Sequence, residues 1–258
     1  MKRIEFIGAS YVGKSFIYRE IAKNIDCESP YLTEEQFLKL GRSEMGLILF
    51  IYRKIKQLFI TNLGGGCYKL YKTPDIKSLD HNTLKNYKLT LTMCFKGDVI
   101  KLKGLEFCNK TYFSVLNRIA KYKYYQSLNS EKTMLAEESI IHWHQALHVL
   151  LLNNKLNLDE GSKKDIGLFP EAIIYCYANK ETILKRIKLR KKDKKINRKH
   201  INLTQNDILN KALVKQNMFF EYSKFAEDMG SNVLRLNTGN SIKENIQKIE
   251  SFLKITLV

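Results

Sequence analysis

The residues best suited to chemistry form a short loop near the start of the chain. The stretch Gly8-Ala9-Ser10-Tyr11-Val12-Gly13-Lys14-Ser15 matches the pattern G-x-x-x-x-G-K-[ST] at each required position. In such a loop the glycines let backbone N–H groups point at a phosphate, and the lysine reaches the β- and γ-phosphates. The serine hydroxyl can bind Mg²⁺. We therefore predict that Gly8 to Phe16 bind a nucleotide, with Ser15 as a ligand of the metal.

The segments on both sides of this loop are those that a phosphate-binding loop requires. Residues 3–7 (RIEFI) favour a β-strand, and apolar residues from Lys14 to about Ile25 follow the spacing of a helix. The helix would direct the positive end of its dipole at the phosphate. The alternative, a chance match in an ordinary strand–turn–helix, is disfavoured by this context.

The rest of the chain alternates strands with helices. This alternation predicts a parallel sheet covered on both faces, with the carboxyl ends of the strands and the site at one edge. The predicted strands are 88–95, 133–136, 171–178 and 232–237. The predicted helices are a short one opened by a capping box at Thr33–Gln36, then 47–60, 111–128, 138–152, 179–192, about 204–229, and a last one capped by Ser241 and Glu244.

Two carboxylates follow the predicted strand 133–136. Glu137 and Glu138 would face the phosphate loop, where a carboxylate can hold Mg²⁺ through water or accept a proton from a hydroxyl. Both glutamates could instead merely cap the next helix. We favour a functional role for one of them, Glu137 ahead of Glu138, with Glu137 as a metal ligand.

Several motifs separate a kinase from other nucleotide-binding proteins. A GTPase would need N-K-x-D, but the segment NKET has Thr182 in place of the aspartate. The helix ETILKRIKLRKK carries Arg186 and Arg190 four residues apart, on one face. With GASYVGKS, LAEES and SNVLRLNTGNSIKENIQKI, this helix resembles the P-loop nucleoside and nucleotide kinases, most nearly the deoxynucleoside kinase and thymidylate kinase group. The resemblance covers about half of the chain.

That resemblance implies a fold and an activity. It implies one domain over residues 1–258, an α/β P-loop NTPase three-layer sandwich with a central parallel sheet. It implies a helical lid at 183–203 and an acceptor-binding insertion at 26–130. The activity would be ATP- and Mg²⁺-dependent phosphoryl transfer to a nucleoside, nucleotide or sugar-like acceptor. The residues implied in catalysis are Lys14, Glu137, Glu138, Arg186 and Arg190.

Charge supports a competing hypothesis. The net charge is +18, and residues 185–200 hold ten Lys or Arg against one Asp. The chain could therefore be a P-loop ATPase or regulatory module that binds nucleic acid through this segment. A third possibility is a structural or interaction protein with a relic loop. Because the charge lies beside the predicted lid, we favour the kinase; the acceptor and the oligomeric state stay open.

Other sequence features argue against further classes of protein. The five cysteines are widely spaced without C-x-x-C, which predicts reduced thiols rather than disulfides or a zinc site. The segment IHWHQALH (141–148) lacks the H-E-x-x-H pattern of a zinc site. The start of the chain is unlike a signal peptide, and no long uncharged apolar run appears, so we expect a cytoplasmic protein with no membrane partner.

Overall fold

The computed structural model describes most of the chain. Its described residues are 2–26, 28–37, 79–128, 130–137, 140–153, 169–193 and 200–257. Glu138, the predicted helix 47–60 and part of the predicted lid lie outside these ranges.

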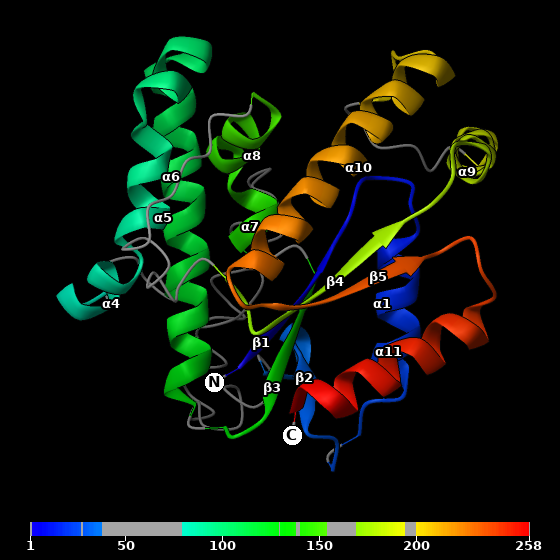
Figure 1. Cartoon of the computed structure of the whole chain (residues 1–258), viewed down its shortest axis with the longest axis horizontal. Coiled ribbons are helices and arrows are strands. Elements are labelled where there is room, and N and C mark those ends of the chain that lie inside the picture. The colour runs from blue at the N-terminus through cyan, green and yellow to red at the C-terminus, as the bar shows by residue number, and fades with distance from the viewer. Residues whose placement is uncertain are drawn as a thin grey trace, which may run out of the picture.

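Five parallel strands form one sheet in the order β2-β3-β1-β4-β5 (Figure 1). β1, β3 and β4 are buried along almost their whole length, as expected for strands covered on both faces. The predicted strands at 3–7, 133–136, 171–178 and 232–237 are thus confirmed. The strands are β1 (Arg3–Ile7), β2 (Tyr31–Thr33), β3 (Thr133–Glu137), β4 (Ala172–Tyr177) and β5 (Asn232–Asn237).

Helices cover both faces of the sheet, which confirms the three-layer α/β sandwich (Figure 1). Side chains alternate along β1: Phe6 packs on Tyr18 of α1, whereas Arg3 packs on Tyr122 of α6. α1 (Lys14–Lys23) and α11 (Ile242–Leu257) lie on one side. On the other side lie α6 (Gly97–Ser127), α7 (Ile140–Trp143), α8 (Gln145–Leu152) and α10 (Gln205–Asp228), with α9 (Lys180–Lys192) beside α10.

β1 carries a feature that its pattern did not predict, a buried ion pair. Arg3 and Glu5 point to the same face, with 2.7 Å between Arg3 Nε and Glu5 Oε1. Both side chains are at most 2% exposed. The guanidinium also lies over the ring of Tyr122, with Cζ 4.9 Å from the ring centroid, and the Arg3 amide donates to the carboxylate of Glu171. The buried guanidinium is therefore paired with one carboxylate and packs on one aromatic ring, while Glu171 satisfies the backbone amide.

The predicted strand 88–95 is wrong. α5 (Lys88–Thr92) and the 3₁₀ helix η2 (Met93–Phe95) occupy it, after the short helix α4 (His81–Asn86). The run of leucine and threonine favoured a strand, but burial falls on two adjacent pairs, Thr90 with Leu91 and Met93 with Cys94, rather than on alternate residues. Tertiary packing decided the conformation here.

The predicted helix 138–152 is broken in two at His144. Its Nδ1 accepts from the amide of Leu147 and so caps α8, while Nε2 bonds the carbonyl of Thr90 at 2.7 Å. A carbonyl only accepts, so Nε2 carries the proton. Burial lowers the pKa of His144 to about 4. This neutral histidine joins α8 to α5.

The two predicted capping boxes differ in detail. At Thr33 the amide and hydroxyl both donate to Gln36 Oε1, and the Gln36 amide donates back to Thr33 Oγ1, which confirms the reciprocal motif. At Ser241 the hydroxyl accepts from the Glu244 amide, but the Glu244 carboxylate bonds Asn240 and Lys248 instead.

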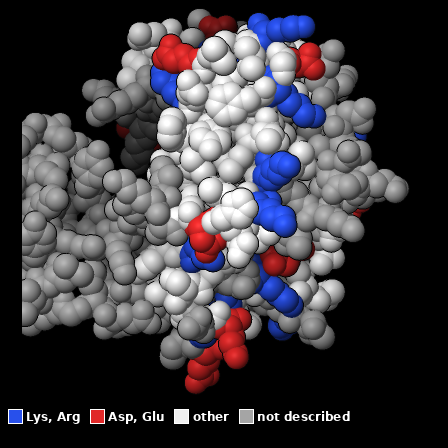
Figure 2. Space-filling model, turned by 90° about the vertical axis from the view of Figure 1, so that its left-hand side faces the viewer, with Lys and Arg blue, Asp and Glu red and all other residues white. Residues whose placement is uncertain are grey.

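The face formed by α4, α5 and α6 is not a basic surface. Figure 2 shows a broad uncharged area there, bordered by scattered Lys, Arg, Asp and Glu. α6 carries Leu102, Leu105 and Phe113, each more than half exposed. In the part of the chain that the structure describes, no helix has the length and apolar character needed to cross a membrane.

Candidate active site

A hollow of about 340 Å³ opens over the carboxyl-end edge of the sheet. The loop between β1 and α1 forms its floor, as the sequence predicts. The lining residues of the loop are Gly8, Ala9, Ser10, Tyr11, Gly13, Lys14 and Ser15. The other lining residues are His142, Trp143, Arg190, His200, Lys215 and Phe219.

Two glycines let the loop follow its path. Gly8 has φ +153°, and a Cβ there would lie 2.5 Å from the carbonyl oxygen of Cys176 on β4. Gly13 has φ +93°, and a Cβ there would lie 3.0 Å from Arg186 Nη1. Any other residue would clash with β4 at Gly8, and would be strained and crowded against Arg186 at Gly13. Both glycines are therefore needed for the shape of the loop.

Tyr11 adopts a left-handed conformation that is unusual for a residue other than glycine, with φ 68°. Its hydroxyl is 2.8 Å from His200 Nδ1, and Arg190 Cζ lies 5.2 Å from its ring centroid. Tyr11 thus connects the loop with residues before and after the undescribed part of the predicted lid.

The central pair of the site is Lys14 and Glu137. Lys14 Nζ lies 2.9 Å from Glu137 Oε1, and the two side chains are 5% and 23% exposed. The parallel register pairs Glu137 with Phe6, which brings the end of β3 beside the start of the loop. A lysine that is almost fully buried needs an anionic partner. The carboxylate supplies it, and a phosphate could do so in its place.

The donor set at this edge suits Mg²⁺. Ser15 provides a hydroxyl and Glu137 a partly exposed carboxylate, and Mg²⁺ binds such hard oxygen ligands while keeping several waters. The residues present therefore fit the metal that the loop pattern predicts.

The hollow is predominantly cationic. Lys14, Arg190 and Lys215 line it, and Glu137 is paired to the first of them. Burial, followed by the charges of Lys14 and Lys215, lowers the pKa of His142 to about 3, so its ring is neutral. This balance suits an anionic ligand with several charges.

Arg186 and Arg190 lie in different places. Arg186 Nη1 donates to the carbonyl of Val12 at 2.5 Å and to Thr238 Oγ1 at 3.0 Å, and Nη2 donates to the Thr238 carbonyl at 2.7 Å. The Thr238 hydroxyl also bonds the Val12 carbonyl. Burial and the neighbouring Arg190 lower the pKa of Arg186. Arg186 thus braces the main chain of the loop, and only Arg190 lines the hollow.

The other predicted residues are divided. Val12 is fully buried below the loop, and Phe16 is about half exposed and does not line the hollow. Glu138 lies outside the described residues. The sequence analysis missed Lys215 and Phe219, which one turn of α10 places over the loop; nothing in the sequence of that amphipathic helix marked them. The sequence favours packing or acceptor contacts around Trp143 over a metal site in the segment 141–148, and Trp143 lines the hollow.

Comparison with protein-family models gives no match, and neither does comparison with curated protein sequences. Among solved structures, the chain is similar to deoxyadenosine kinase from M. mycoides with bound dATP, at 15% identity and TM-score 0.45, covering 98% of this chain and all of that one. It is also similar to the same enzyme with bound dCTP, at 13% identity and TM-score 0.43, covering 98% and 99%. The fold assignment depends on the sheet order and the loop, not on these likenesses.

Proposed function

We propose that this protein transfers a phosphoryl group from ATP, with Mg²⁺, to a hydroxyl or phosphate of a small molecule, in the manner of a nucleoside or nucleotide kinase. The observation that carries the proposal is the buried Lys14–Glu137 pair in a cationic hollow below a glycine-bracketed loop. Such a pair holds a lysine ready to exchange its carboxylate for a phosphate oxygen.

The reaction requires positioning and charge neutralisation more than covalent chemistry. The amides of Gly13 and Lys14 and the ammonium of Lys14 would hold the β- and γ-phosphates. As the acceptor oxygen bonds to the γ-phosphorus, the bond from that phosphorus to the bridging oxygen of ADP breaks. A hydroxyl acceptor gives its proton to a carboxylate, for which Glu137 is our first candidate, provided that it holds Mg²⁺ through water rather than directly.

The metal and the remaining cations would share the charge that develops. Ser15 and Glu137 would hold Mg²⁺, which when bound neutralises charge on the β- and γ-phosphates. Arg190 and Lys215 would contact the transferring group from the opposite wall. Arg186 would act as a positioning residue, because its fork holds the Val12 carbonyl and thereby the loop.

The acceptor would enter between the loop and α7. Trp143 lines the hollow there, and Arg118 of α6 lies over its indole, with Cζ 4.9 Å from the ring centroid. This aromatic wall lies beside α6. That helix belongs to the region 26–130, which we propose for acceptor binding. Residues 183–203 would form the lid.

The test is a screen of Mg-ATP with acceptor panels, measured as ADP formed and as phosphorylated product. The panels are ribonucleosides, deoxynucleosides, nucleoside monophosphates and simple sugars. We expect one class to raise ADP formation, and Lys14→Ala to lower that rate about 10²- to 10³-fold. Lys23→Ala, an exposed lysine on the same helix, is the matched control.

Two results would contradict the proposal. One is a folded protein that fails to bind Mg-ATP by calorimetry. The other is ATP hydrolysis that RNA or DNA stimulates with steep salt dependence while no small acceptor is phosphorylated, which would favour the nucleic-acid ATPase instead.

A further inference from the structure

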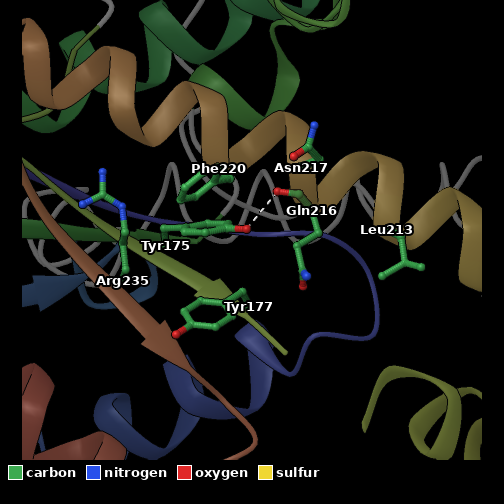
Figure 3. Close-up of a pocket in the computed structure, with 7 residues that line it drawn as sticks. All are labelled: Tyr175, Tyr177, Leu213, Gln216, Asn217, Phe220 and Arg235. Atoms are coloured by element: carbon green, nitrogen blue, oxygen red, sulfur yellow. Dashed lines mark hydrogen bonds between the residues drawn. The ribbon is translucent and has the colours of Figure 1, made fainter. Parts of the chain in front are cut away.

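A second cavity, of about 420 Å³, lies between α10 and the outer strands of the sheet. Figure 3 shows its aromatic and polar lining. It shares no lining residue with the hollow over the phosphate loop. None of its lining residues belongs to a motif that the sequence predicts to be functional. Its lining residues are Tyr175, Tyr177, Leu213, Gln216, Asn217, Phe220 and Arg235.

The cavity has two walls of regular structure. Tyr175 and Arg235 are register partners on β4 and β5, and Tyr177 follows two residues later on the same face. The lining residues of α10 are spaced i, i+3, i+4 and i+7 from Leu213, so they form one stripe along the helix. Both walls belong to rigid elements rather than to loops.

Hydrogen bonds fix these walls relative to each other. The Tyr175 hydroxyl donates to the carbonyl of Gln216 at 2.8 Å (Figure 3). The side-chain amide of Gln216 in turn accepts from the Ala178 amide at 3.0 Å and donates to the Ala178 carbonyl at 3.1 Å. The cavity is therefore preorganised, which reduces the cost of ordering on binding.

Aromatic rings dominate the lining. Tyr175 and Tyr177 are stacked, with centroids 5.8 Å apart and an interplanar angle of 24°. Phe220 lies 6.1 Å from Tyr175, and it is 36% exposed. Tyr175 is buried behind them at 3% exposed, so the rings that a ligand can reach are Tyr177, which is partly exposed, and Phe220. Accessible aromatic rings in a preformed cavity are suited to stacking with a flat ring.

The polar groups that line the cavity do not favour an anionic ligand. Arg235 is paired with Glu227 at 2.6 Å, which neutralises its charge. Asn217 and the Tyr177 hydroxyl have no hydrogen-bond partner among the described residues. Lys224, whose Nζ lies 4.9 Å from the centroid of the Phe220 ring, is likewise paired with Glu221. The cavity therefore offers donors and acceptors, but no unpaired charge, to the edge of a ligand.

We propose that this cavity binds an uncharged, planar nitrogen heterocycle of nucleobase class. The ring would stack on the aromatic lining, and its polar edge would bond Asn217 and the Tyr177 hydroxyl. The site is separate from the hollow, but α10 serves both: Lys215 and Phe219 line the hollow, whereas Gln216 and Phe220, one residue further on, line this cavity. The proposal does not depend on the proposed kinase activity.

The test uses the full chain labelled with 3-fluorotyrosine and observed by ¹⁹F NMR. Tyr177→Phe assigns the resonance of Tyr177. The probes are adenosine, guanosine, cytidine and uridine, with ribose as a control that lacks a ring. Fluorescence of Trp143, the single tryptophan, reports on the hollow in the same titration.

We expect at least one nucleoside, and not ribose, to shift the Tyr177 resonance saturably. Phe220→Ala should raise the midpoint about tenfold, because stacking on one ring is lost. Asn217→Leu, on an exposed position, should raise it and change the order of preference among the bases. Phe113→Ala, an exposed aromatic on α6, is the matched control and should leave the midpoint unchanged.

Two outcomes overturn the proposal. The first is no saturable shift with any of the four nucleosides. The second is a shift that survives both Phe220→Ala and Asn217→Leu and follows the fluorescence of Trp143 with the same midpoint, since the ligand would then occupy only the hollow.

Discussion

Two ion pairs, one within β1 and one beyond its carboxyl end, have similar N–O distances but different surroundings. Arg3 and Glu5 lie 2.7 Å apart and Lys14 and Glu137 2.9 Å apart. In the first pair both side chains are enclosed, whereas Glu137 keeps 23% of its surface exposed. The first pair can only be made or broken with the fold. The second can exchange partners with a ligand.

We infer from this difference that burial of the anion distinguishes a structural ion pair from one that a ligand can reach. A fully enclosed pair contributes no binding capacity, because no ligand can reach it, and losing one partner leaves a bare charge in the core. A lysine that is buried beside a partly exposed carboxylate keeps its charge, and a phosphate can reach and bind it. Two predictions test this comparison directly, and a third tests His144, another ionisable group of the interior.

The largest effect is expected at Arg3. Arg3→Met leaves Glu5 buried without its cation and should lower the free energy of unfolding by about 3–5 kcal/mol. The double variant Arg3→Met with Glu5→Leu should recover most of that loss, since it removes both charges. Urea denaturation measures both. A loss below about 1 kcal/mol in the single variant would contradict the structural role.

An intermediate effect on the free energy of unfolding is expected from His144, which is buried in the protein interior. The pKa of His144 is about 4 when folded and about 6.5 when unfolded. Between these values the unfolded chain binds more protons, so stability falls as the pH falls from about 6.5 to 4, by up to about 1.4 kcal/mol per pH unit for this group. His144→Asn keeps a cap for α8 and should make the pH slope shallower by that amount. Urea denaturation across this pH range measures it, with exposed His81→Asn as the control; an unchanged slope would refute the assignment.

The smallest effect on stability is expected at Lys14. Lys14→Ala should change the free energy of unfolding by no more than about 1 kcal/mol, because water can solvate the Glu137 that remains. The same variant should lower the rate of phosphoryl transfer about 10²- to 10³-fold, as predicted above. A loss of stability equal to that of Arg3→Met would show that the two pairs do not differ as we infer.

The sequence predicted those parts of the fold that local pattern determines. A strong pattern of apolar residues and caps marks three parts of the chain. They are the strand–loop–helix at 3–23, the two strands that end beside Glu137 and Thr238, and the helix after β4. The parallel topology was then enough to predict that Glu137 faces the loop of Lys14, although no sequence feature indicates that contact directly.

The errors arose where distant packing overrides local pattern. Leucine and threonine alternate at 89–92, yet α8 and its cap at His144 hold that segment as helix. β1 was predicted as a mostly apolar strand, so the ion pair between Arg3 and Glu5 was not predicted. Only the fold shows which groups face these two side chains. Arg186 was expected over the phosphates, and the helical spacing could not tell which arginine the loop would engage.

Arg186 also sets a limit on how α9 can respond to a nucleotide. Its guanidinium ties the middle of that helix to the carbonyl of Val12 and, through Thr238, to the turn after β5. The amino-terminal half is thereby anchored to the floor it would have to swing across. If residues 183–203 form the lid proposed above, we therefore expect any movement of that lid to begin beyond residue 186, within the helix rather than at its first turn.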